Sequence, residues 1–268
     1  MLKLYDHPLS PYAQKVKIAL REKGQPFETL TPGGLGAGGA AGEFLQANPR
    51  AEVPALVDGE VRVFDSTIIL EYIEDRWPDP PLLPSGPAER ARVRMLEEAM
   101  DTHFEAINWG LSEIRWFRRA EGELERTLLA RAASQTRRWY AWLEDELADR
   151  TWFNGETFGW GDLAVAPYLN GSVGHGLPPD KGTRLAAWLE RANARSSVAR
   201  TAEEAAASSR AAAMPNVAEL VRQGLFKREY RDHRLEWMIK SGGAQVVIDG
   251  LARDNIRFSP DFGPRPAD

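Results

Sequence analysis

The spacing of apolar residues divides the chain into a first part that alternates strands with helices and a longer part that is mostly helical. The runs at 2–5 and 27–30 have the length and composition of strands. Between them, apolar residues recur at helical spacing from Pro11 to Gly24, and glycine is a typical helix stop. Because a strand, a helix and a strand follow one another, we expect the two strands to be parallel.

A tight hairpin is predicted next. Two apolar runs, 55–57 and 61–64, enclose Asp58-Gly59, a dipeptide that favours a two-residue antiparallel turn. A helix over 66–76 follows, with its apolar residues on one face. The first 76 residues therefore predict a βαβ unit, a connecting segment and a ββα unit.

Two stretches rich in glycine or proline join these elements. The segment "TPGGLGAGGAAGEF" lacks the Gly-Lys-Ser/Thr ending of a phosphate loop and the spacing of a dinucleotide fingerprint, so we expect a flexible loop. The segment "RWPDPPLLPSGP" has five prolines in twelve residues. Such a stretch breaks helices, and it predicts an interdomain linker over 77–87.

Beyond the linker, nearly every residue up to 213 follows helical periodicity, which predicts a helical bundle. The expected helices are 88–119, 123–149, 161–175, 183–194 and 197–213. In the tail, two short amphipathic helices are expected within 232–243 and 244–255, then a short strand at 256–259 and a frayed end. The predicted organisation is a domain at 1–76, the linker 77–87, a helical domain at 88–213 and a C-terminal extension at 214–268.

Composition excludes several kinds of chemistry. The 268 residues include no cysteine, which excludes disulfides, thiolate metal sites and any mechanism based on the protein's own thiol. The four histidines lack metal-ligand spacing, so we expect no metal site. The formal net charge of −5 argues against a nucleic-acid partner. No apolar run approaches the roughly 18 residues of a membrane helix, and no signal peptide is visible, so we expect a cytoplasmic protein.

Ser10 is the most informative polar residue of the first part. It stands at the start of the first predicted helix, and Pro11 follows at the first helical position. Ser-Pro suits an ordinary N-cap, but a helix N-terminus also stabilises anions. A nucleophilic role is not expected, because no Ser–His–Asp arrangement is evident. The residues alone leave the cap and the ligand-binding role open.

Three motifs in order resemble the soluble glutathione transferase superfamily. They are "SPYAQKVKIALREKG", "NPRAEVPALVDG" and "DSTIILEYIED", and a helical domain follows them. The resemblance covers roughly residues 1–213 and is strongest to the serine-type members, especially the plant tau class and related bacterial groups. It implies a combined α/β and all-α fold: a thioredoxin-like N-terminal domain, a helical-bundle C-terminal domain and the extension. It also implies a homodimer, since the family usually forms one.

One family motif is imperfect. A Ser/Thr–x–x–Asp capping box usually opens the sixth helix, whereas "TFGWGDLAVAP" has Gly159 and Asp162. Glycine is an acceptable N-cap without a hydroxyl, and Asp162 can still accept from a backbone amide. We expect this difference to affect stability more than chemistry.

The resemblance implies that glutathione supplies the reactive sulfur. In the thioredoxin-like domain, Ser10 occupies the place of the first redox cysteine and Ala13 that of the second. Ser10 would then donate a hydrogen bond to the glutathione sulfur and favour its thiolate. Tyr5 is the rival, because other classes use a tyrosine near the end of the first strand.

The resemblance also suggests which residues hold glutathione. Val53 would pair with the tripeptide backbone beside Pro54, which is cis in the family. Asp65 would meet the γ-glutamyl ammonium, and Ser66 with the helix amides would take its carboxylate. The lysine that some relatives use near the second helix has no clear counterpart here, so the glycine carboxylate would be held differently.

The second substrate would lie between the two domains. Tyr12 on the first helix and His103, Ile107 and Trp109 on the long helix are the expected lining residues, although the same spacing is typical of a core. An apolar lining would suit hydrophobic electrophiles, and conjugation of these in detoxification is the implied activity. Two alternatives stay open: a non-catalytic scaffold of the same fold and a carrier of apolar ligands. The electrophile, the reaction subtype and the role of 214–268 also stay open.

Overall fold

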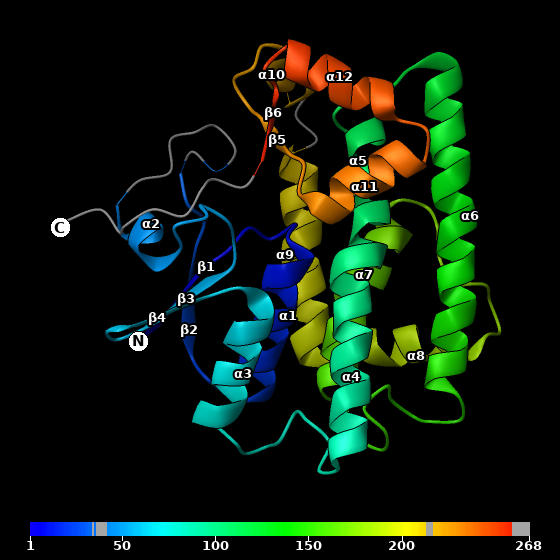
Figure 1. The fold of residues 1–268 in the computed structure, drawn as a ribbon. Helices are drawn as coiled ribbons and strands as arrows, with labels where there is room; N and C mark the ends of the chain where they lie inside the picture. Colours follow the sequence, from blue (N-terminus) through cyan, green and yellow to red (C-terminus); the bar gives the residue numbers. More distant parts are fainter. Residues whose placement is uncertain (34, 36–41, 213–216, 259–268) are drawn as a thin grey trace.

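The computed structural model describes residues 1–33, 35, 42–212 and 217–258. A small sheet with its helices lies beside a larger group of helices, and the extension lies across the top of that group (Figure 1). The thioredoxin-like domain and the helical domain predicted from the sequence are confirmed.

The sheet has four strands in the order β2-β1-β3-β4. Its strands are β1 Leu2–Tyr5, β2 Phe27–Leu30, β3 Ala55–Asp58 and β4 Val61–Phe64. As predicted, β1 and β2 are parallel, and β3 and β4 form an antiparallel hairpin in which Gly59 adopts φ +60°. Because side chains alternate across a strand, Leu4 enters the main core and its neighbour Tyr5 a second cluster on the other face.

Helices cover both faces of this sheet. Helices α1 Pro11–Glu22 and α3 Ser66–Arg76 contribute to the main core, and the short α2 Glu43–Ala47 packs against Tyr5 on the other face. Residues 34 and 36–41 of the predicted glycine-rich loop lie outside the described residues.

The linker is fixed by buried polar contacts. The Glu74 carboxylate accepts from the backbone N–H groups of Leu82 and Leu83, at 3.0–3.1 Å. Lys23 forms an ion pair with Glu74 at 2.6 Å and donates to the Pro80 carbonyl at 2.7 Å. These contacts hold the segment that follows α3 against the first domain.

The helical domain follows the predicted order with one interruption. Its helices are α4 Pro87–Ala99, η1 Met100–Phe104, α5 Glu105–Arg115, α6 Gly122–Leu147, α7 Trp160–Gly174, α8 Arg184–Asn193 and α9 Ser196–Ala212. The single helix expected over 88–119 ends earlier and contains a π-helical turn, η1. No described helix combines the length and hydropathy needed to cross a membrane.

Asp162 fulfils its predicted role. Its carboxylate accepts from the Gly159 amide at 3.1 Å, the Phe153 amide at 2.8 Å and the Trp188 indole N–H at 2.7 Å. Burial raises the pKa of Asp162 to about 6 although these donors favour the charged form.

The extension forms a layer of its own. It comprises α10 Val217–Arg222, β5 Arg228–Glu229, α11 Asp232–Lys240, α12 Ala244–Ala252 and β6 Ile256–Arg257. Both helices predicted from the amphipathic pattern and the strand after them are confirmed, whereas α10 and β5 were not predicted. Trp237 and Met238 of α11 join Trp109 and Ile114 of α5 in a second hydrophobic core. The end predicted to be frayed lies outside the described residues.

Candidate functional site

Three candidate segments leave the sheet at one edge. Tyr5 at the end of β1 is opposite Ala55 at the start of β3, and Ala55 is opposite Phe64 at the end of β4. The segment that leads to Ser10, the Val53-Pro54 pair and the Asp65-Ser66 pair therefore all lie near this edge.

Ser10 caps α1 and faces a large cavity. Its backbone is extended (φ −78°, ψ 114°), and its Oγ accepts from the Ala13 N–H at 3.3 Å. The cavity, about 1430 Å³ in volume, is lined by Ser10 together with Pro11 and Val53 of the first domain. Among the described residues, no acceptor takes the Ser10 hydroxyl hydrogen, so the group can still donate to a ligand.

Tyr5 has a different environment. Its side chain is 6% exposed, packs on the Phe44 ring at 5.3 Å and donates from its hydroxyl to Glu43 Oε2 at 3.2 Å. Burial, with help from Glu43, raises the pKa of Tyr5. Tyr5 is absent from the described lining of the Ser10 cavity, so its hydroxyl faces a carboxylate rather than the cavity.

The other proposed glutathione residues differ in accessibility. Val53 lines the cavity, and the Val53-Pro54 peptide bond is cis, as the family resemblance implied. Asp65 is the N-cap of α3: its Oδ1 accepts from the Thr67 and Ile68 amides at 3.1 and 3.4 Å. Asp65 is exposed, whereas Ser66 is buried, and neither belongs to the described cavity lining.

Asp65 also adopts an unusual backbone conformation. Its φ of +73° is rare for a residue with a side chain and costs on the order of 1–3 kcal/mol. This conformation directs Oδ1 to the α3 amides, while Oδ2 lies 3.8 Å from the Arg50 guanidinium. A carboxylate held in this way is a suitable partner for a ligand cation.

The structure separates the four residues predicted to line the electrophile site. Tyr12 and Trp109 line the Ser10 cavity. His103 and Ile107 line a second pocket of about 390 Å³ instead, with Trp139 of α6. His103 and Ile107 are four residues apart and so share one helix face, which is not the face that carries Trp109. The prediction that places all four in one site is therefore wrong in geometry for His103 and Ile107.

The Tyr12 hydroxyl makes contacts within the protein. Its hydroxyl donates to the Asp101 carbonyl at 2.7 Å and lies 3.4 Å from His233 Nε2. Burial raises the pKa of Tyr12 well above its usual value, so it stays neutral. Tyr12 therefore shapes the cavity without acting as an acid or base.

A buried ionic network holds α1 against the helical domain. The Lys15 ammonium, fully buried, contacts the carboxylates of Glu97 and Asp101. Trp160 donates to Glu97 at 2.6 Å and Tyr168 to Asp101 at 2.7 Å. Burial raises the pKa of Asp101 to about 6, and the neighbouring Glu97 adds to this effect. The network fixes the helix whose N-terminus carries Ser10.

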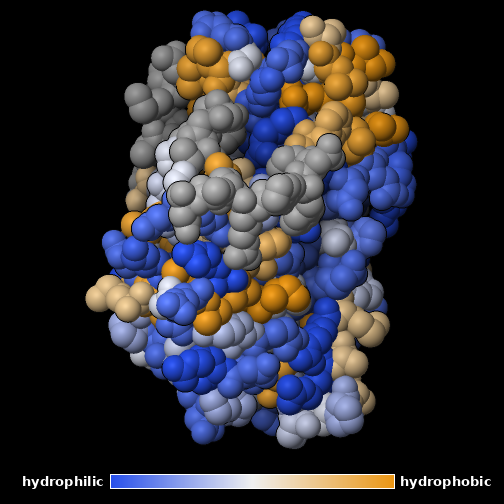
Figure 2. All heavy atoms as spheres, turned by 60° about the vertical axis from the view of Figure 1, so that its left-hand side comes forward, coloured by the Kyte–Doolittle hydropathy of each residue, from blue (hydrophilic) through white to orange (hydrophobic). Residues whose placement is uncertain are grey.

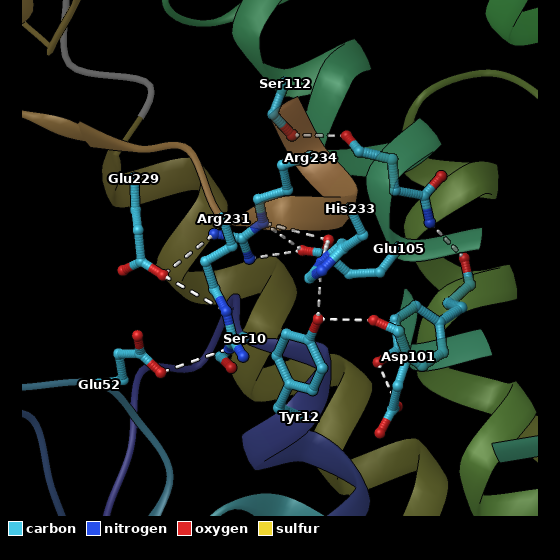
Figure 3. Close-up of polar contacts among 12 residues, drawn as sticks. Ser10, Tyr12, Glu52, Asp101, Glu105, Ser112, Glu229, Arg231, His233 and Arg234 are labelled. Carbon is cyan, nitrogen blue, oxygen red and sulfur yellow. Dashed lines mark hydrogen bonds and ion pairs between the residues drawn. The ribbon is translucent and has the colours of Figure 1, made fainter. Parts of the chain in front are cut away.

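The extension supplies cavity residues that the sequence reasoning missed. Figure 3 shows Arg231 and Arg234 reaching towards the end of the cavity that holds Ser10 and Tyr12. Arg231 forms an ion pair with Glu52 at 3.3 Å, and Arg234 with Glu105 at 2.6 Å. The dense charges of "KREYRDHR" were the available signal. The two glutamates that pair with Arg231 and Arg234, however, lie more than a hundred residues away in sequence.

Glu105 is the anchor of this contact. His233 Nε2 lies 3.0 Å from Glu105, beside the Arg234 pair. Burial opposes ionisation of Glu105, but the Arg234 charge and the bonds from His233 and Arg234 outweigh it and lower the pKa to about 2. Glu105 is therefore ionised at neutral pH and holds the extension on α5.

No group of three or more His, Asp or Glu side chains that could hold a metal ion occurs in the described part of the chain.

Comparisons with known proteins agree with this architecture. The model of the glutathione S-transferase N-terminal domain matches residues 4–81, and that of the C-terminal domain matches 116–191. The chain belongs to the glutathione S-transferase superfamily.

Two relatives illustrate its breadth. The chain is 30% identical over 206 residues to glutathione S-transferase U28 of Arabidopsis thaliana, covering 73% of this chain and 85% of the relative. It is also 30% identical over 173 residues to a stringent starvation protein A homolog of Coxiella burnetii, covering 63% of this chain and 75% of the relative. Among solved structures, rice GST1 in complex with glutathione superposes with a TM-score of 0.66 at 27% identity, covering 79% of this chain and 94% of that chain. The extension lies outside both family models.

Proposed function

We propose that this protein is a glutathione transferase in which Ser10 stabilises the glutathione thiolate. The observation that carries the proposal is the position of the Ser10 hydroxyl, at the N-terminus of α1 and on the wall of a large cavity. The similarity to glutathione S-transferase U28 and to rice GST1, which was solved in complex with glutathione, supports it.

The chemistry follows from ordinary electrostatics. A free thiol has a pKa of about 8.5, so only a few per cent is ionised at neutral pH. The N-terminus of a helix carries roughly half a positive charge, which favours an anion beside it. A hydrogen bond from Ser10 stabilises the same anion. Together they lower the pKa of the bound thiol.

Glutathione would bind along the edge where the three segments meet. The backbone of Val53 pairs with the cysteinyl unit in this proposal, as a strand edge pairs with a peptide. The Asp65 carboxylate takes the γ-glutamyl ammonium, and the start of α3 with Ser66 takes the γ-glutamyl carboxylate. The sulfur then lies near Ser10 and faces the cavity.

The second substrate is an electrophile that enters the cavity beside Tyr12 and Trp109. The thiolate donates an electron pair to an electrophilic carbon, forming a carbon–sulfur bond. The displaced pair leaves with a leaving group or moves onto an acceptor atom of the substrate. The walls hold the two reactants together.

A conjugation assay with 1-chloro-2,4-dinitrobenzene and glutathione tests the proposal. We expect turnover by the wild type, a loss of about a hundredfold or more in Ser10→Ala, and partial recovery in Ser10→Thr, which keeps a hydroxyl. Turnover by Ser10→Ala equal to that of the wild type would rule out the assigned role.

The alternative is a protein of this fold that binds without turnover. The name of the Coxiella burnetii relative mentions no transferase activity, which is the observation that favours it. A scaffold would bind no glutathione, and a carrier would bind apolar ligands without forming the thiolate.

We also propose a cytoplasmic homodimer. Val61 on β4, Ile68 on α3 and Met95 on α4 are 43%, 55% and 70% exposed, respectively, and such apolar side chains suit a subunit contact. Light scattering after size-exclusion chromatography tests this. Twice the chain mass is the expected result, and a monomer at micromolar concentration contradicts it.

A further inference from the structure

The wall of the Ser10 cavity is strongly cationic on the side of the extension. Three carboxylates line the described cavity: Glu52, Glu105 and Glu229. The extension contributes six cations: Arg222, Lys227, Arg228, Arg231, Arg234 and Arg257. The end of α5 adds Arg115 and the turn after it Arg118. This excess contrasts with the formal charge of −5 on the whole chain.

Carboxylates do not fully compensate these cations. Glu229 is shared by three arginines, with contacts of 2.5 Å to Arg257, 3.8 Å to Arg234 and 4.0 Å to Arg231. The buried Glu113 is shared by Arg228 and Arg119. Each shared carboxylate leaves positive charge in excess at the cavity wall.

Arg115 and Arg118 form no ion pair with any described carboxylate. Arg115 donates to the His175 carbonyl at the end of α7. Arg118 is exposed and lines the cavity with φ +52°, in a turn that glycine would make without strain. Among the described cations of the wall, the Arg118 side chain is therefore the one least engaged in contacts within the protein.

Two aromatic rings lie in the same wall of the cavity as Arg118 and Arg228. The rings of Phe117 and Phe226 are parallel within 4°, with centroids 6.2 Å apart. The Arg228 guanidinium lies 3.8 Å from the Phe117 centroid. In Figure 2, hydrophilic and hydrophobic surfaces alternate in the upper part of the molecule, where Figure 1 places the extension. A flat apolar body and an anionic group would both find partners here.

We propose that the extension makes the second half of the cavity a site for organic anions, so that the electrophile has an aromatic or apolar body and carries a carboxylate or sulfonate. This inference rests on the proposed transferase function. Its anionic group lies near Arg118 and Arg228, and its apolar body packs on Phe117 and Phe226. The proposed site narrows the expected class of electrophile from hydrophobic compounds to amphipathic anions.

Two ligands of nearly equal shape test the charge preference. Naphthalene-2-carboxylate and naphthalene-2-carboxamide differ mainly in charge. Calorimetric titration of the full chain, with and without glutathione, should show the carboxylate binding at least about tenfold more tightly. Added salt should weaken the binding of the carboxylate and leave the binding of the carboxamide nearly unchanged. Equal affinities would overturn the proposal.

Variants of Arg118 locate the site. Arg118→Gln should lower the affinity for the carboxylate several-fold, because one charge-assisted hydrogen bond is lost. The affinity for the carboxamide should not change. Arg118→Lys should restore most of the affinity, and Arg118→Glu should reduce the preference for the carboxylate further than Arg118→Gln does. Arg126→Gln is the matched control, since Arg126 is exposed on α6 and paired only with Glu123 among the described residues. A preference that is unchanged in both Arg118→Gln and Arg118→Glu would contradict this location.

A parallel titration of glutathione separates the two proposals. Glutathione thiolate formation without a carboxylate preference overturns the anion site alone. A carboxylate preference without glutathione binding supports the anion site and overturns the transferase.

Discussion

Trp237 of the extension occupies the space that a side chain at Gly110 would need. A Cβ atom at Gly110 would lie 2.1 Å from Trp237 Cζ3, far inside the van der Waals contact distance. Gly110 is in the middle of α5, where glycine costs roughly 1 kcal/mol relative to alanine. The docking of α11 on α5 therefore depends on a residue that otherwise weakens its helix.

Gly110→Ala should loosen the extension. We expect a net loss of about 1–3 kcal/mol in the free energy of unfolding, because overpacking outweighs the gain in helix propensity. Thermal unfolding and limited proteolysis after residue 213 measure it. Gly174→Ala, at the end of α7 with nothing within 4 Å of the added atom, is the control. A Gly110→Ala protein as stable and as protease-resistant as the control would contradict the docking described here.

The Glu105–Arg234 pair should be strongly coupled. Either Glu105→Gln or Arg234→Gln leaves a buried charge with a poor partner and should cost about 3 kcal/mol of stability. The double variant should cost clearly less than the sum of the two. A double-mutant cycle by urea unfolding gives the coupling energy. The exposed Glu123–Arg126 pair serves as comparison and should give less than about 0.5 kcal/mol. Equal coupling energies for the two pairs would refute the anchoring role of Glu105.

Two buried carboxyls should each lower the stability as the pH rises from about 4 to 6. Burial raises the pKa of Asp101 and of Asp162 from 3.8 to about 6. At these two carboxyls the folded state binds more protons than the unfolded state in this window, so each contributes a negative slope of stability against pH. Buried His175, whose pKa burial lowers to about 4, contributes a slope of the opposite sign. Asp162→Asn should make the slope of stability against pH more positive by about 1 kcal/mol per pH unit, although its absolute stability will be lower.

Urea unfolding at several pH values between 4 and 6 measures the slope. The comparison uses slopes rather than absolute stabilities, so the lost hydrogen bonds of Asp162→Asn do not confuse it. Equal slopes in the wild type and in Asp162→Asn would show that the Asp162 carboxyl ionises normally.

Local signals predicted most of the first domain. Asp58-Gly59 defined the hairpin, and the Ser10-Pro11 pair defined the start of α1, because turn and cap preferences depend on neighbouring residues. The long helix after the linker was less predictable. Its periodicity continues through Met100–Phe104, and the π-helical turn there has no counterpart in the apolar pattern.

The site was predicted only where backbone position determined it. Ser10 and Val53 reach the cavity because sheet register brings their segments together. His103 and Ile107 were assigned to the wrong cavity, because a helical period shows which residues share a face and not which neighbour covers it. Arg231 and its partner Glu52 are 179 residues apart, and no local pattern connects them.

The most direct test is an ultraviolet difference titration of glutathione thiolate on the protein across pH. We compare the wild type with Ser10→Ala and with Tyr5→Phe, because the Tyr5 hydroxyl faces Glu43 instead of the cavity. We expect a bound-thiol pKa well below the free value of about 8.5 in the wild type and in Tyr5→Phe, and a return towards that value in Ser10→Ala. A low pKa that persists in Ser10→Ala and disappears in Tyr5→Phe would contradict this expectation.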